Sequence, residues 1–112
     1  MYIAIGNKKT GKTYITFKNL NDCKLFNKIL LKNEGAIFEC DIQGQVIHYK
    51  DDEFINFVFK NEKINKNYKR VYTLINETGS NIYIHMKKHN IAAIEFDDYY
   101  AVINPTTNIK LF

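Results

Sequence analysis

The sequence contains no tryptophan, one proline and one arginine, and the scarcity of arginine bears most directly on function. Fifteen of the sixteen basic side chains are lysines, and Arg70 is the exception. The planar guanidinium of arginine is the usual group for reading guanine edges, whereas lysine offers only a point charge. This bias disfavours sequence-specific DNA recognition. A formal net charge of +4 still permits weak, salt-dependent attraction to nucleic acid or to acidic proteins.

The sequence also lacks the long apolar run that a signal peptide or a membrane helix requires. We therefore expect a cytoplasmic protein without a membrane partner, in the host cytoplasm if a phage encodes it. Cys23 and Cys40 lack the spacing of a metal or redox motif. We interpret them as reduced, small core hydrophobes, and a disulfide or a reactive thiol is the alternative.

What the sequence does contain suits one compact core. Hydrophobic residues make up 46% of the 112 residues, and phenylalanine and tyrosine contribute eight residues each. A chain of this length has room for one core, so we expect a single α+β domain over residues 1–112. Isoleucine, lysine and asparagine account for 45 residues. Their codons are rich in A and T, which indicates a low-GC bacterium, or one of its phages or plasmids, as the source.

Residues 6–13 read GNKKTGKT, which fits the phosphate-loop pattern of nucleotide-binding enzymes. A working phosphate loop leads into a helix whose N-terminus faces the anion. Residues 13–18 instead alternate β-branched and aromatic residues, which predicts a strand. We therefore interpret residues 7–12 as the loop of a lysine-rich hairpin. Its candidate anion-binding side chains are Lys8, Lys9 and Lys12.

The main helix is predicted near residues 22–33, with Asn21 or Asp22 as its cap and Gly35 as its stop signal. Its apolar stripe consists of Leu25, Phe26, Ile29 and Leu30. Its opposite face is a basic ridge of Lys24, Lys28 and Lys32. We interpret this ridge as a solvated helix face, and the alternative is a contact with an acidic partner.

Most of the remaining sequence predicts strands. Hairpins are expected from residues 2–5 with 13–18, and from residues 36–42 with 45–50. Residues 53–60 fit a helix and a strand nearly equally, and residues 60–70 predict a basic loop. Further strands are expected at residues 71–75, 82–86, 91–96, 99–103 and 109–112. The expected fold is α+β, an antiparallel sheet of hairpins and a C-terminal meander packed on the one main helix.

The titratable residues form no catalytic constellation. His85 and His89 have the spacing of two metal ligands on a helical turn. Their surroundings predict the end of a strand, where this spacing would separate the rings. The acidic runs 51–53 and 95–98 fall at element ends, where carboxylates cap helices and hold turns rather than act as acid–base or metal pairs. We therefore expect no catalytic residue, no metal and no cofactor.

Tyrosines near lysines provide the remaining functional pattern. Five of them lie in the last 45 residues, at Tyr68, Tyr72, Tyr83, Tyr99 and Tyr100. The pattern is typical of base-stacking surfaces, of protein-binding hot spots and of ordinary strands. We expect partner contacts through Lys63, Lys66, Tyr68, Lys69, Arg70 and Tyr72.

The expected function is that of a small non-enzymatic protein that binds a larger protein or ribonucleoprotein complex. A phage or mobile-element inhibitor of a host defence system, comparable to an anti-CRISPR protein, fits the size and composition. Nucleic-acid binding through the lysines and tyrosines is the alternative, and a phosphate-loop nucleotide-binding enzyme is the third hypothesis. The sequence leaves the oligomeric state open, including a homodimer.

Overall fold

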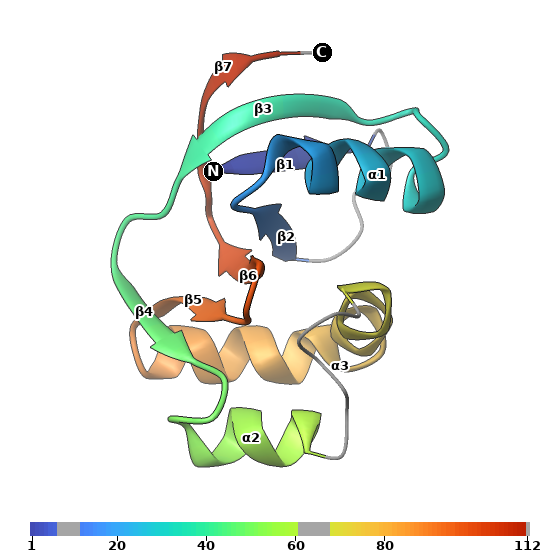
Figure 1. The fold of residues 1–112 in the computed structure, drawn as a ribbon. Coiled ribbons are helices and arrows are strands. Elements are labelled where there is room, and N and C mark those ends of the chain that lie inside the picture. Colours follow the sequence, from blue (N-terminus) through green and yellow to red (C-terminus); the bar gives the residue numbers. More distant parts are fainter. Residues whose placement is uncertain (7–11, 61–67, 112) are drawn as a thin grey trace.

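The computed structural model describes residues 1–6, 12–60 and 68–111, and its architecture is α+β (Figure 1). Seven strands form one mixed sheet in the order β4-β5-β6-β2-β1-β3-β7. The strands are β1 (Tyr2–Ile5), β2 (Thr13–Phe17), β3 (Ala36–Asp41), β4 (Gln45–His48), β5 (Ile91–Glu95), β6 (Tyr99–Ile103) and β7 (Thr106–Lys110). The helices are α1 (Leu20–Leu30), α2 (Glu53–Phe59) and α3 (Tyr68–Lys88). The predicted fold class is confirmed.

One of the two predicted hairpins is confirmed, and so is one strand pair of the predicted C-terminal meander. Strands β1 and β2 pair antiparallel, with Tyr2 opposite Phe17, while most of the predicted loop between them lies outside the described residues. Strand β2 begins at Thr13, the last residue of the GNKKTGKT string, so no helix begins where a phosphate loop would require one. Strands β5 and β6 also pair antiparallel, with Glu95 opposite Tyr100.

The predicted hairpin of residues 36–50 is wrong. Strand β3 pairs with β1 and β7, whereas β4 lies at the other edge of the sheet and pairs parallel to β5. Gly44 lies between them with a φ of 124°, and a Cβ added there would come within 2.9 Å of the Ala92 Cβ. The chain therefore crosses to β5 at this glycine instead of turning back, and the sheet is mixed rather than wholly antiparallel.

The strands predicted at residues 71–75 and 82–86 are wrong, because one long helix, α3, spans both. Its buried side chains include Val71, Ile75, Ile82 and Met86. Their spacing of four, seven and four residues follows one face of a helix, and short apolar runs concealed this period within the two segments. Helix α3 begins at Tyr68, inside the predicted basic loop of residues 60–70. Residues 61–67 of that loop lie outside the described part of the chain.

The undecided segment 53–60 forms helix α2. Asp52 caps it, because its Oδ1 accepts a hydrogen bond from the backbone N–H of Ile55 at 3.0 Å. Ile55 and Phe59 are buried one turn apart. The cap at Asp52 and the four-residue spacing of the buried side chains favour a helix here, whereas the short apolar run alone fitted a helix and a strand nearly equally.

The predicted main helix is present as α1, from Leu20 to Leu30. It ends earlier than expected because Lys32 and Asn33 adopt left-handed backbone angles, with φ of 51° and 61°. The predicted stripe is only half correct. Phe26 is buried, whereas Leu25 and Ile29 remain 44% and 42% exposed. Cys23 and Asn27 occupy the core-facing positions instead.

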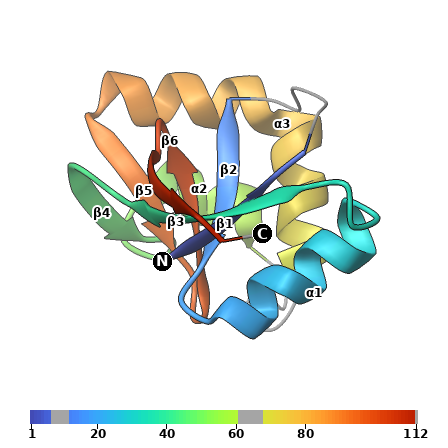
Figure 2. The same cartoon turned by 90° about the horizontal axis from the view of Figure 1, so that it is seen from above.

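The helices and the sheet meet in one hydrophobic cluster with an aromatic centre. The Phe17 ring of β2 lies 5.4 Å from the rings of both Phe26 and Tyr68, measured between centroids. Figure 2 shows α1 beside the first turns of α3, as this contact requires. The aromatic cluster therefore fixes the two helices relative to each other.

Candidate functional site

Four of the six predicted partner-binding residues lie on the first turns of α3, and Lys63 and Lys66 lie outside the described residues. Tyr68 and Tyr72 are half-buried, with ring centroids 6.0 Å and 5.3 Å from that of Phe26. Burial, with a smaller effect from Asp22, raises the pKa of Tyr68. The two tyrosines therefore fasten α3 to α1 rather than project into solvent.

Lys69 and Arg70 are exposed at the N-terminal end of α3. The first turn of this helix, which the structure describes in full, contains no acidic side chain. A helix N-terminus carries a partial positive charge, so each basic residue there costs about 0.3–1 kcal/mol at low salt. Lys69 and Arg70 therefore lie at the end of α3 where the helix dipole disfavours positive charge.

Helix α1 packs against the first turns of α3 through Phe26, and part of the exposed face of α1 was predicted to lie in the core. Leu25 and Ile29 are neighbours on one helical turn, with the exposed Lys24 and Lys28 beside them. A stripe of four apolar residues at i, i+1, i+4 and i+5 is too wide for all of them to face the core equally. The buried face of α1 instead carries Cys23, Phe26 and Asn27, and Cys23, a residue type often found in cores, was the one sequence signal for it.

We define the α1/α3 surface as Leu25, Ile29, Lys24, Lys28, Lys69 and Arg70. Leu25 and Ile29 are adjacent on one helix, whereas the other strongly exposed apolar side chains of the described helices are isolated. Phe57 on α2 is 68% exposed and Ile84 on α3 is 62% exposed, and neither has an exposed large apolar neighbour on its own helix.

The five tyrosines of the last 45 residues are engaged within the fold. Tyr99 is buried, and Tyr68 and Tyr72 pack on Phe26. The Lys18 ammonium lies 5.2 Å from the Tyr100 ring centroid, and the Lys12 ammonium lies 4.9 Å from that of Tyr83. These contacts occupy ring surface that stacked bases would need. Of the candidate anion-binding lysines, Lys12 is exposed, and Lys8 and Lys9 lie outside the described residues.

The expected separation of His85 and His89 is wrong, because His85 lies on α3 and His89 directly follows it. Their ring centroids are 4.5 Å apart. His85 Nε2 lies 3.0 Å from Asp52 Oδ1, and its ring stacks on Phe54. Partial burial alone would raise the pKa of Asp52. The hydrogen bond from Ile55 and the contact with His85 outweigh it and hold that pKa below its ordinary value. The pair connects α2 to α3.

Other chemically notable side chains have structural partners. Glu95 accepts hydrogen bonds from the Tyr100 hydroxyl at 3.0 Å and from the Lys18 ammonium at 3.3 Å. The Tyr100 bond contributes most to lowering the pKa of Glu95. Cys23 and Cys40 are buried free thiols, as predicted, and burial raises their pKa values to about 12 and about 11. Within the described ranges, no group of three or more His, Cys, Asp or Glu residues is arranged to hold a metal ion.

Within residues 1–6, 12–60 and 68–111, no helix combines the length and the apolar character needed to cross a membrane. Comparisons with protein-family models, with curated proteins and with solved structures found no match to this chain.

Proposed function

We propose that this protein is a small non-enzymatic binding protein that engages a larger protein or ribonucleoprotein complex through the α1/α3 surface. The observation that carries the proposal is the exposed pair Leu25 and Ile29 on α1, with the exposed lysines of that helix beside it. At 44% and 42% exposure, these side chains leave apolar area in water that a partner can cover. The exposed lysines beside this pair on α1 favour a partner with acidic groups around its own apolar patch.

The surface is preorganised, which supports a binding role. Tyr68 and Tyr72 pack against Phe26, so the exposed faces of α1 and α3 keep a fixed relation to each other. A surface held this way loses little conformational freedom on binding. The engaged tyrosine rings favour a protein contact over base stacking, because binding single-stranded nucleic acid would require them to leave these contacts.

The biological role stays a prediction from composition and size. A phage or mobile-element inhibitor of a host defence complex would use such a surface to block an acidic or RNA-binding site on its target. Cytoplasmic location and the absence of catalysis belong to the same proposal.

Capture from nuclease-treated lysate of a low-GC bacterial host tests the proposal. Tagged wild-type protein should retain one protein complex at near-stoichiometric amounts, and the double variant L25S/I29S should lose at least about tenfold of it. The control F57S/I84S removes two large exposed apolar side chains from α2 and α3 and should retain the complex. Circular dichroism of each variant verifies its fold.

Equal retention by both double variants would contradict the α1/α3 surface, and recovery of no protein by the wild type would contradict the binding role. A salt series separates the nucleic-acid alternative. Phosphate-dominated binding declines steeply with salt, whereas an interface anchored on Leu25 and Ile29 declines little.

A further inference from the structure

His85 and His89 form a pair of imidazole side chains at the C-terminal end of α3. The backbone N–H of His89 donates to the His85 carbonyl at 3.1 Å, so the helical turn continues to His89 and places both residues on one face. Their ring centroids lie 4.5 Å apart, and the ring planes are tilted by 49°. Two histidines four residues apart on one helical turn are a common arrangement for binding a transition metal ion.

The separation of the two rings fits a shared metal ion. Imidazole nitrogens bind zinc at about 2.0–2.1 Å. With one nitrogen of each ring at that distance, and bond angles between square-planar and tetrahedral, the ring centroids lie roughly 4.5–5.2 Å apart. The observed 4.5 Å falls at the short end of this range. The centroid separation is therefore compatible with both rings binding one ion.

Asp52 on the neighbouring element orients the His85 ring. Its two carboxylate oxygens lie 3.0 Å and 3.1 Å from His85 Nε2. An ionised carboxylate can only accept hydrogen bonds, so Nε2 carries the proton and Nδ1 is the unprotonated nitrogen of the neutral ring. Histidines that bind metal ions usually donate their other N–H in this way. The Phe54 ring also stacks on His85, at a centroid distance of 4.5 Å, and restricts its orientation further.

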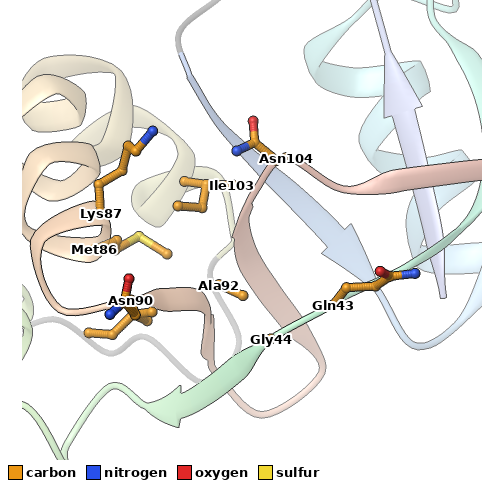
Figure 3. A pocket seen from close by; sticks show the side chains of 9 residues that line it. Gln43, Gly44, Met86, Lys87, Asn90, Ala92, Ile103 and Asn104 are labelled. Carbon is orange, nitrogen blue, oxygen red and sulfur yellow. The ribbon is translucent and has the colours of Figure 1, made fainter.

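The charges around the histidine pair favour a cation. The last carbonyl groups of α3 contribute roughly half a negative charge, and Asp52 contributes a full one. Lys87 and Lys88 in the last turn oppose them. Lys87 follows His85 by two residues, so it lies on nearly the opposite side of the helix. It lines the open pocket of about 230 Å³ in Figure 3, whose lining includes neither histidine. Lys88 is thus the nearer opposing charge, and Asp52 with the helix end exceeds it.

We propose that His85 and His89 bind one divalent transition metal ion of the zinc, copper or nickel class, through Nδ1 of His85 and one ring nitrogen of His89. Imidazole ligands favour these ions over magnesium and calcium. Asp52 is a positioning residue, and water completes the coordination, since the described residues offer no set of three protein ligands. The site goes beyond the proposed function. It lies at the opposite end of α3 from Lys69 and Arg70, so either proposal can fail without the other.

Calorimetric titration of the untagged protein with Zn²⁺ tests the site. The wild type should bind one ion per chain with saturation. His89→Gln should weaken binding at least about tenfold, because one of the two protein ligands is lost. His89 is exposed, so this variant should keep its fold, which circular dichroism verifies. The matched control His48→Gln removes the histidine of β4, whose ring lies 4.7 Å from that of Tyr49, and should bind as the wild type does.

NMR of the imidazole nitrogens tests the role of Asp52. Zn²⁺ should shift the Nδ1 signal of His85 and leave its Nε2 protonated. An ion bound at Nε2 would overturn the proposal, because the contact with Asp52 would then be broken. Absence of saturable binding, or unchanged affinity in His89→Gln, would overturn it as well. Equal weakening in His89→Gln and His48→Gln would do the same, since separate histidines would then explain the uptake.

Discussion

At the residue scale, the buried side-chain amide of Asn27 shows most clearly how one residue determines local structure. Asn27 is 8% exposed in α1, and its side chain accepts from the Gly35 N–H at 2.9 Å and donates to the Gly35 carbonyl at 3.1 Å. The two bonds join the end of α1 to the start of β3. A Cβ on Gly35 would lie 2.5 Å from the Asn27 Oδ1, so the glycine is required for this approach. Gly35 is recognisable in the sequence as a stop signal, but its partner eight residues earlier is not.

Replacement of Asn27 by alanine should destabilise the protein by about 2–3 kcal/mol, because it leaves two half-buried backbone groups of Gly35 without partners. Urea unfolding measures the change. Asn21→Ala, at an exposed position on the same helix, is the matched control and should change the free energy of unfolding by less than about 0.5 kcal/mol. A similar loss in both variants would show that the bridge contributes little.

The carboxylate of Asp52 makes a pH-dependent contribution to the stability of the folded protein. Its pKa is lowered in the folded state, so its stabilisation is complete above the unfolded-state value of about 4 and is lost as pH falls through the folded-state value. At neutral pH, Asp52→Asn should lower the free energy of unfolding by about 0.5–1 kcal/mol. Asparagine still caps α2, so the change isolates the charge.

Urea unfolding across this pH range is the measurement, and the exposed neighbour variant Asp51→Asn is the control. The difference between wild type and Asp52→Asn should shrink as the solution becomes more acidic than the folded-state pKa. A difference that is constant with pH would contradict a role for the ionised carboxylate beside His85.

At the element scale, local patterns predicted the elements whose pairing is also local. The hairpins β1–β2 and β5–β6 join neighbours in the chain, so alternation and turn residues were sufficient. Helix α3 was missed because the β-branched and aromatic residues of its two halves resemble strands. The α1/α3 surface could be predicted only in part, since Lys69 and Arg70 stand out in the sequence, whereas the exposure of Leu25 and Ile29 depends on how α1 rotates toward the core.

The crossing at Gly44 explains why the second hairpin did not form, and it is open to test. Gly44→Ala should destabilise the protein by about 1–3 kcal/mol, because the backbone angle disfavours a side chain and the new Cβ would approach Ala92 too closely. Adding Ala92→Gly removes the second of these causes and should recover part of the loss. Urea unfolding of both variants measures these changes in the free energy of unfolding. An unchanged free energy of unfolding in Gly44→Ala would contradict the role assigned to this glycine.

At the scale of the whole molecule, the sheet brings together strands that are distant in sequence. Strand β7 at the C-terminal end pairs with β3 at one edge, while β4 and β5 pair at the other. No local pattern contains this order, because it depends on which edges remain open after the hairpins form. The same long-range packing places α1 beside the first turns of α3 and creates the α1/α3 surface.

Hydrogen–deuterium exchange on the captured complex tests the central claim most directly. If the α1/α3 surface is the contact, binding should slow exchange in peptides covering α1 and the first turns of α3 and leave α2 and β7 unchanged. Protection confined to α2 or β7, with α1 exchanging as in the free protein, would contradict the proposed binding surface.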